Sequence, residues 1–181
     1  MSEFNFEALH DNLIYVLKES QMKIGYTDNA ASLNYPPASL ARLMGVEQDD
    51  VLLRQALEEF SLYAEPILGQ ITVSVYDGQF CLTIPHKGVR YVHENVAESL
   101  FLRELIDGVM QHQLRNIGEV RALFCRYSDK VVCEETEGDG YDHVLYFADG
   151  QPDSFVYLFE TAFGHISYHR MTKADYAAEI G

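Results

Sequence analysis

The chain has 181 residues, a length that suits one domain with a sizeable core or two small units packed together. Its 48% hydrophobic and 12% aromatic residues argue against wholesale disorder. Because 28 acidic residues face only 13 Lys and Arg, the net charge is −15, and such a chain repels nucleic acid and anionic lipid. The apolar runs are too short to span a bilayer, so we expect no membrane protein and consider nucleic-acid binding unfavourable.

The N-terminus and the cysteines both indicate the cytoplasm. The chain begins MSEFNFEALHD, which lacks the basic and apolar regions of a secretory signal. The cysteines, Cys81, Cys125 and Cys133, are odd in number and have no C-x-x-C spacing, which is typical of reduced thiols. We therefore expect a cytoplasmic protein without a disulfide.

In the first third of the chain, apolar residues recur at spacings of three and four, which predicts amphipathic helices. We expect three of them, over residues 6–24, 38–44 and 51–65. Gly25 and Gly45 end the first two, and Pro66 ends the third. The stretch 26–35 has no periodicity and is predicted to be a loop.

The clearest local pattern is a β-hairpin, in which ITVSVY is followed by Asp77-Gly78 and then by QFCLTI. A two-residue Asp-Gly loop is typical of a type I′ turn. The resulting register pairs three apolar residues on each strand: Val75 with Phe80, Val73 with Leu82, and Ile71 with Ile84. We expect this apolar face to lie on a core.

The second half predicts helices and then an antiparallel meander. A short strand over 89–93 precedes a long helix from Asn95 to Leu114, and Asn116 with Glu119 begins the next helix as a capping pair. Strands are expected over residues 131–135, 142–147, 155–160 and 165–170, with a final helix after Thr172. The predicted fold class is α+β, with a helical unit and hairpin at 1–93 and helices plus a meander at 94–181, packed as one domain.

The order helix, short helix, turn, longer helix and hairpin resembles a winged helix, and PASLARLMGV is similar to the second helix and turn of helix-turn-helix proteins. That resemblance implies DNA binding through the third helix. This helix and the turn before it carry five acids against Arg54: Glu47, Asp49, Asp50, Glu58 and Glu59. Phosphate contacts need Lys and Arg, so a DNA-binding regulator is the disfavoured alternative.

Three segments, LNYPPASLARLMGV, VLYFADGQPDSFVYLFE and SYHRMTKADY, resemble an uncharacterised bacterial family of about this length, a domain of unknown function. The resemblance covers most of the chain. It implies no activity, cofactor or catalytic residue.

Motifs for catalysis, cofactors and metals give no positive signal. The sequence has no G-x-S-x-G elbow and no glycine-rich phosphate loop. No pair of histidines has metal-ligand spacing, and His165 and His169 would lie about 13 Å apart on a strand. We therefore name no catalytic residue, no metal ligand and no cofactor.

One basic segment, PHKGVRYVH at residues 85–93, has two fixed positive charges, two histidines and no acid. It suits an anionic group or an acidic surface, or else it compensates charge within the protein through surface ion pairs. The candidate binding residues are Tyr35, His86, Lys87, Arg90 and His93. The preferred hypothesis is a noncatalytic protein-interaction or regulatory protein with a protein partner. The alternative is a small-molecule-binding protein or enzyme with its site between the two units.

Overall fold

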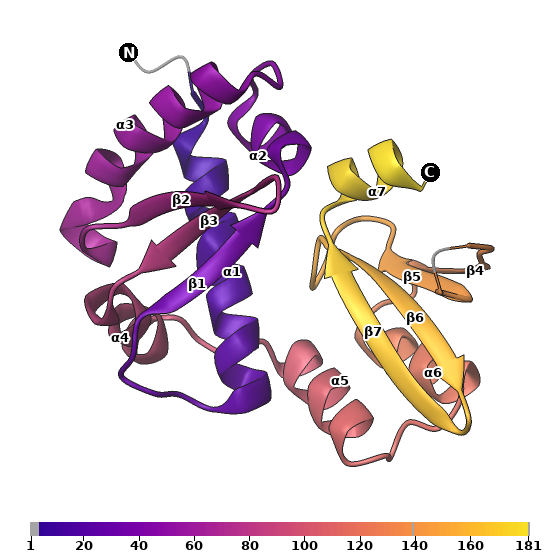
Figure 1. Cartoon of the computed structure of the whole chain (residues 1–181). Coiled ribbons are helices and arrows are strands. Elements are labelled where there is room, and N and C mark those ends of the chain that lie inside the picture. The colour runs from indigo at the N-terminus through magenta and orange to yellow at the C-terminus, as the bar shows by residue number, and fades with distance from the viewer. Residues whose placement is uncertain (1–3, 139, 181) are drawn as a thin grey trace. The chain divides into compact units, whose positions relative to one another are not determined.

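In the computed structural model, the described residues, 4–138 and 140–180, form two units with separate cores, Met1–Glu98 and Ser99–Gly181 (Figure 1). The predicted α+β class is confirmed. None of the helices within the described ranges is long and apolar enough to cross a membrane.

The first unit begins with α1 (Phe6–Ile24), β1 (Ala31–Tyr35), α2 (Pro37–Met44) and α3 (Asp50–Leu68). It continues with β2 (Thr72–Tyr76), β3 (Gln79–Ile84) and α4 (His86–Asn95). The three strands form an antiparallel sheet in the order β1-β3-β2. Helix, strand, two helices and a hairpin, with the first strand beside the last, is the winged-helix topology. In it α3 holds the place of the recognition helix, and the β2–β3 hairpin is the wing.

Strand β1 corrects the expected loop over 26–35. Its burial alternates along ASLNY, and Leu33 and Tyr35 lie opposite Leu82 and Phe80 of β3. A strand of five residues is too short to show a periodic signal in a polar stretch, so only its sheet partner reveals it.

The hairpin turn and two of its three predicted pairs are confirmed. Asp77 and Gly78 have φ of 49° and 73°, as a type I′ turn requires, and Val75 and Val73 lie opposite Phe80 and Leu82. The third pair, Ile71 with Ile84, falls just outside the ladder because β2 begins at Thr72, which lies opposite Thr83 as the predicted register requires. The prediction that Val75 faces the core is also wrong. Its side chain is 43% exposed because β2 is an edge strand, whose tip extends past the core.

Helix α3 continues through Pro66, where the sequence had predicted its end. Proline removes the donor for the carbonyl four residues earlier, which belongs to Leu62. Both residues are exposed, so water can solvate that carbonyl. The helix ends at Leu68, before Gly69, which has φ of 77°.

The segment predicted as a strand over 89–93 lies in helix α4. Val89 and Val92 are both buried, at helical spacing, and Gly88 packs against the backbone of Leu68 in α3. Asn95 ends this helix and does not begin the next. Helix α5 (Leu100–Met110) starts later and stops before Leu114. Ser99 caps it, because its hydroxyl oxygen accepts a hydrogen bond from Leu102 N.

The second unit contains α5, α6 (Ile117–Tyr127), β4 (Val131–Glu135), β5 (His143–Phe147), β6 (Val156–Ala162), β7 (His165–Met171) and α7 (Lys173–Glu179). Its sheet runs in the order β4-β5-β6-β7, so the predicted meander is confirmed. Asn116 Oδ1 accepts from Glu119 N at 3.0 Å, which confirms the predicted cap of α6. Edge-to-face and stacked rings fill the core: Phe101, Phe124, Phe147, Tyr157 and Phe159.

Candidate functional site

Three of the five candidate residues meet in one hollow of the first unit. His86, Lys87 and Arg90 project from α4 and line a shallow depression of about 520 Å³ with the end of α3. Glu94 and Ile67 also line it. The depression is open to solvent and contains both fixed positive charges of the basic segment.

Arg90 holds Asp28 in a bidentate ion pair. Its Nη2 lies 2.6 Å from Asp28 Oδ2, and its Nε donates to Oδ1 at 3.3 Å. The Arg90 hydrogen bond, together with one from the Tyr26 hydroxyl, holds the pKa of Asp28 below its usual range. Tyr26 also stacks on His93, with ring centroids 3.9 Å apart. The fourth candidate residue, His93, therefore belongs to a surface cluster that ties α4 to the segment before β1.

Lys87 completes the end of helix α3. Its ammonium group donates to the backbone carbonyls of Pro66 at 3.1 Å and Glu65 at 3.4 Å. The last carbonyls of a helix lack intrahelical donors and carry the negative end of the helix dipole, which favours a cation there. Lys87 thus has an intramolecular role beside any binding role.

Tyr35 lies away from the other four candidates. It ends β1, is 7% exposed, and its hydroxyl donates to Asn12 Oδ1 at 3.0 Å. Burial raises the pKa of Tyr35, so the phenol stays neutral in the folded protein. The structure therefore gathers His86, Lys87, Arg90 and His93 along α4 and places Tyr35 in the core of the sheet.

A second hollow lies between α3 and β2. It measures about 440 Å³. Eight residues line it: Arg54, Glu58, Ser61, Leu62, Glu65, Gln70, Ile71 and Val73. The α3 members follow one stripe of the helix at spacings of three and four. We call this surface the α3–β2 groove.

Sequence reasoning missed the α3–β2 groove as a whole. It had placed Val73 on the core face of the hairpin and had given Leu62, which is 71% exposed, no role. The spacing of Glu58, Leu62 and Glu65 marks a single polar and apolar face of α3, and this pattern was the available signal.

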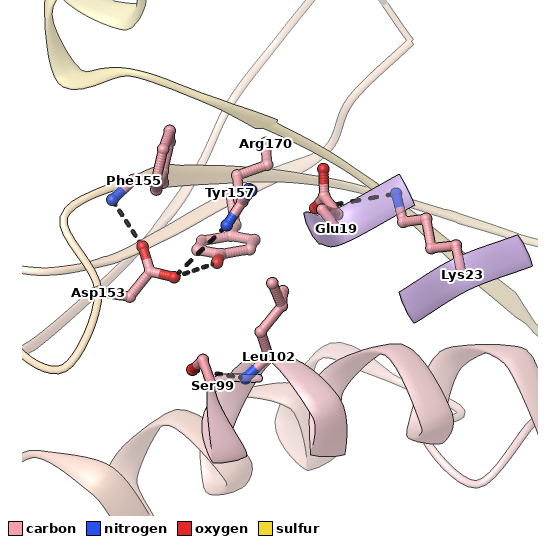
Figure 2. Close-up of polar contacts among 8 residues, drawn as sticks. All are labelled: Glu19, Lys23, Ser99, Leu102, Asp153, Phe155, Tyr157 and Arg170. Atoms are coloured by element: carbon pink, nitrogen blue, oxygen red, sulfur yellow. Dashed lines mark hydrogen bonds and ion pairs between the residues drawn. The ribbon is translucent and has the colours of Figure 1, made fainter. Parts of the chain in front are cut away.

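The second unit contains a buried polar network (Figure 2). Asp153 accepts from the Tyr157 hydroxyl at 2.6 Å and from Phe155 N at 2.7 Å, and Arg170 Nη1 lies 3.8 Å from the same carboxylate. Arg170 also stacks over the Phe155 ring, 4.2 Å from its centroid. The Asp153 and Arg170 side chains are only 8% and 5% exposed, so this network joins β6, β7 and the turn before them.

Among residues 4–138 and 140–180, no three His, Cys, Asp or Glu side chains gather in a way that holds a metal ion. In comparisons with known proteins, no curated protein matches the chain. No solved structure matches it either. One family model matches almost the full length, as the resemblance of the three sequence segments implied. The chain belongs to the family described as "Domain of unknown function, E. rectale Gene description (DUF3877)", whose model matches residues 6–180.

Proposed function

We propose that the chain is a noncatalytic interaction or regulatory protein whose winged-helix unit binds a basic and apolar segment of a protein partner in the α3–β2 groove. The observation that carries the proposal is the composition of this groove, in which the exposed Leu62 and the half-buried Val73 are flanked by Glu58 and Glu65. An apolar strip bordered by acids favours Lys- and Arg-containing segments with large apolar side chains.

The same composition disfavours DNA as the ligand. Binding to DNA depends on Lys and Arg that displace counterions from phosphate. Among the residues that line the groove, Arg54 carries the positive charge. Its guanidinium lies 5.8 Å from the centroid of the Phe80 ring. Glu58 and Glu65 border the groove, and the wing tip carries Asp77, so the surface that would meet phosphate is acidic.

The free edge of β2 suggests how the segment binds. Within the described sheet, β2 pairs only with β3, so its other edge has unpaired N–H and C=O groups. An extended segment that adds to this edge forms main-chain hydrogen bonds, while alternate side chains reach Leu62 and Val73. Edge strands accept partners in this way because the pairing satisfies backbone groups on both sides.

The proposed location is the cytoplasm. The chain has three cysteines, none of them in a disulfide, and an acidic pI near 4.7. Free thiols suit a reducing compartment, and the net charge of −15 favours a basic partner at long range.

A peptide selection tests the groove. Random linear peptides displayed on phage are selected on the full chain, and the peptides that bind are measured by fluorescence anisotropy. We expect them to combine Lys or Arg with aliphatic or aromatic residues. Because burial of a leucine side chain contributes about 1.5–3 kcal/mol, Leu62→Asp should weaken binding by about tenfold to a hundredfold.

The matched control is Val51→Asp, which makes the same kind of change at a position of α3 outside the groove. The two side chains have similar exposure, 76% for Val51 and 71% for Leu62, so neither change should unfold the helix. Peptides without basic residues, or binding that Leu62→Asp leaves unchanged, would refute the proposal. A gel shift with random duplex DNA at micromolar protein and about 150 mM salt should show no complex, and a salt-sensitive complex would favour the DNA-binding alternative.

A further inference from the structure

Two exposed histidines from distant parts of the sequence meet on the second unit. His112 lies in the turn after α5, and His165 begins β7. Their Nδ1 atoms are 3.4 Å apart, their ring centroids are 5.0 Å apart, and their planes are inclined by 65°. We propose that this pair is a binding site for Zn²⁺, with both Nδ1 atoms as ligands.

The separation of the two nitrogens agrees with tetrahedral zinc. Zinc–nitrogen bonds of about 2.0–2.1 Å at a tetrahedral angle place two ligand nitrogens about 3.4 Å apart. The right angle of square-planar or octahedral sites would place them about 2.9 Å apart. The observed distance between His112 Nδ1 and His165 Nδ1, 3.4 Å, therefore fits the tetrahedral case.

The separation of the two rings gives independent support. Two imidazoles that direct Nδ1 to one tetrahedral zinc have ring centroids about 5 Å apart, whereas two rings in line along an N–H···N bond have centroids nearly 6 Å apart, on the order of one bond length more. The observed 5.0 Å between the rings of His112 and His165 matches the converging arrangement.

The backbone holds both rings on well-defined turns. His112 has φ of 55°, and the amides of the next two residues both donate to Gly108 O at 2.9 Å, which closes the end of α5. Glycine is the preferred residue at this left-handed position, so the histidine is there against the local backbone preference. His165 follows the two-residue turn Phe163-Gly164, with φ of 53° and 76°, and lies opposite Ala162.

The chemistry needs only a change of tautomer. Without metal, the two Nδ1 atoms lie within hydrogen-bonding distance, and a ring that carries its hydrogen on Nδ1 can share it with the other. When Zn²⁺ binds, that hydrogen moves to Nε2 of the same ring, so both imidazoles stay neutral and both Nδ1 lone pairs face the metal. Two coordination positions remain for water or for groups of another molecule, which makes this an open site.

Isothermal titration of ZnCl₂ into the untagged chain tests the site. The variants are His112→Asn, His165→Gln and the double variant. Asparagine is chosen because it tolerates the left-handed φ of position 112, and circular dichroism verifies that each variant is folded. The matched control is His169→Gln, since His169 is also exposed and lies on the same strand, four residues beyond His165.

We expect each single variant to weaken Zn²⁺ binding by about tenfold or more, because one imidazole cannot chelate. The double variant should be little weaker than either single variant, and His169→Gln should bind like the wild type. Losses that multiply in the double variant would indicate two separate sites and overturn the proposal. Zn²⁺ binding by the double variant with the affinity of the wild type, or no binding by the wild type, would overturn it as well.

Discussion

Gly88 gives the sharpest test of how the first unit is packed. It lies in α4, where replacement by alanine would ordinarily raise helix stability by about 1 kcal/mol. The structure reverses that expectation. A Cβ at this position would lie 2.5 Å from the carbonyl oxygen of Leu68 and 2.5 Å from Cγ2 of Ile84.

The size of the stability loss depends on how far α4 must move to accept the new Cβ. Real Cβ atoms essentially never approach another heavy atom within 3.0 Å, so α4 must shift by at least half an ångström or so from the end of α3. Overpacking of a well-filled core costs about 1–3 kcal/mol, and we expect the upper end because one contact is with backbone. After the gain in helix propensity is subtracted, Gly88→Ala should lower the free energy of unfolding by about 2 kcal/mol.

Calorimetry and urea titration followed by circular dichroism measure this loss. For a unit the size of Met1–Glu98, a loss of about 2 kcal/mol corresponds to a fall of roughly 8–16 °C in Tm. Hydrogen exchange read by mass spectrometry should place the loss in residues 4–98. Gly118→Ala is the control, since Gly118 is an exposed residue of α6 whose added Cβ would meet only Asn116 Oδ1, at 3.1 Å. A Gly88→Ala protein as stable as the wild type would refute the packing of α4 on α3.

Three further changes test other parts of the chain. Gly78→Val puts a β-branched residue at φ of 73°, where nothing lies within 4 Å of the new Cβ. Backbone strain alone should therefore lower the free energy of unfolding by about 1–2 kcal/mol in a urea titration, and an unchanged unfolding midpoint would contradict the turn. Asp153→Ala removes the acceptor of the Tyr157 hydroxyl and the buried carboxylate near Arg170. Calorimetry should therefore show that the free energy of unfolding falls by about 3 kcal/mol or more, and a fall below about 1 kcal/mol would show that the network is dispensable. Burial raises the pKa of Tyr35 above its unfolded value, so the stability that this group contributes is complete below about pH 10 and is lost as the pH rises further. Urea titrations above about pH 10 should therefore show that the free energy of unfolding falls less steeply with pH for Tyr35→Phe than for the wild type. An identical fall in the two proteins would contradict the burial.

Local chemistry explains which elements the sequence predicted correctly. The Asp77-Gly78 turn and the Asn116 and Thr172 caps are specified by residues within four positions of one another. The meander is also local, because every strand in it pairs with its neighbour along the chain. Each of these features was accordingly predictable from the sequence alone.

The errors occur where distant residues decide the structure. Strand β1 exists because β3, some fifty residues later, offers it an edge. Helix α4 was mistaken for a strand because it has few apolar residues. The reason for Gly88 also lies far along the chain, since a side chain there would collide with the end of α3. Pairs such as Arg90 with Asp28, separated by 62 residues, and His112 with His165, separated by 53, carry no spacing signal at all.

The topology of the first unit and the composition of its surface favour different ligands. A winged-helix arrangement determines only where α3 and the wing stand, whereas the ligand depends on the side chains that they carry. Here the stripe of α3 that faces the groove alternates Glu58 and Glu65 with Leu62, and β2 beside it keeps a free edge. Phosphate would meet carboxylates on this surface, while a basic extended segment would meet opposite charge, an apolar strip and unpaired backbone groups together. The acidic and apolar composition of this surface is therefore the reason for proposing a basic peptide, and not DNA, as the ligand of the α3–β2 groove.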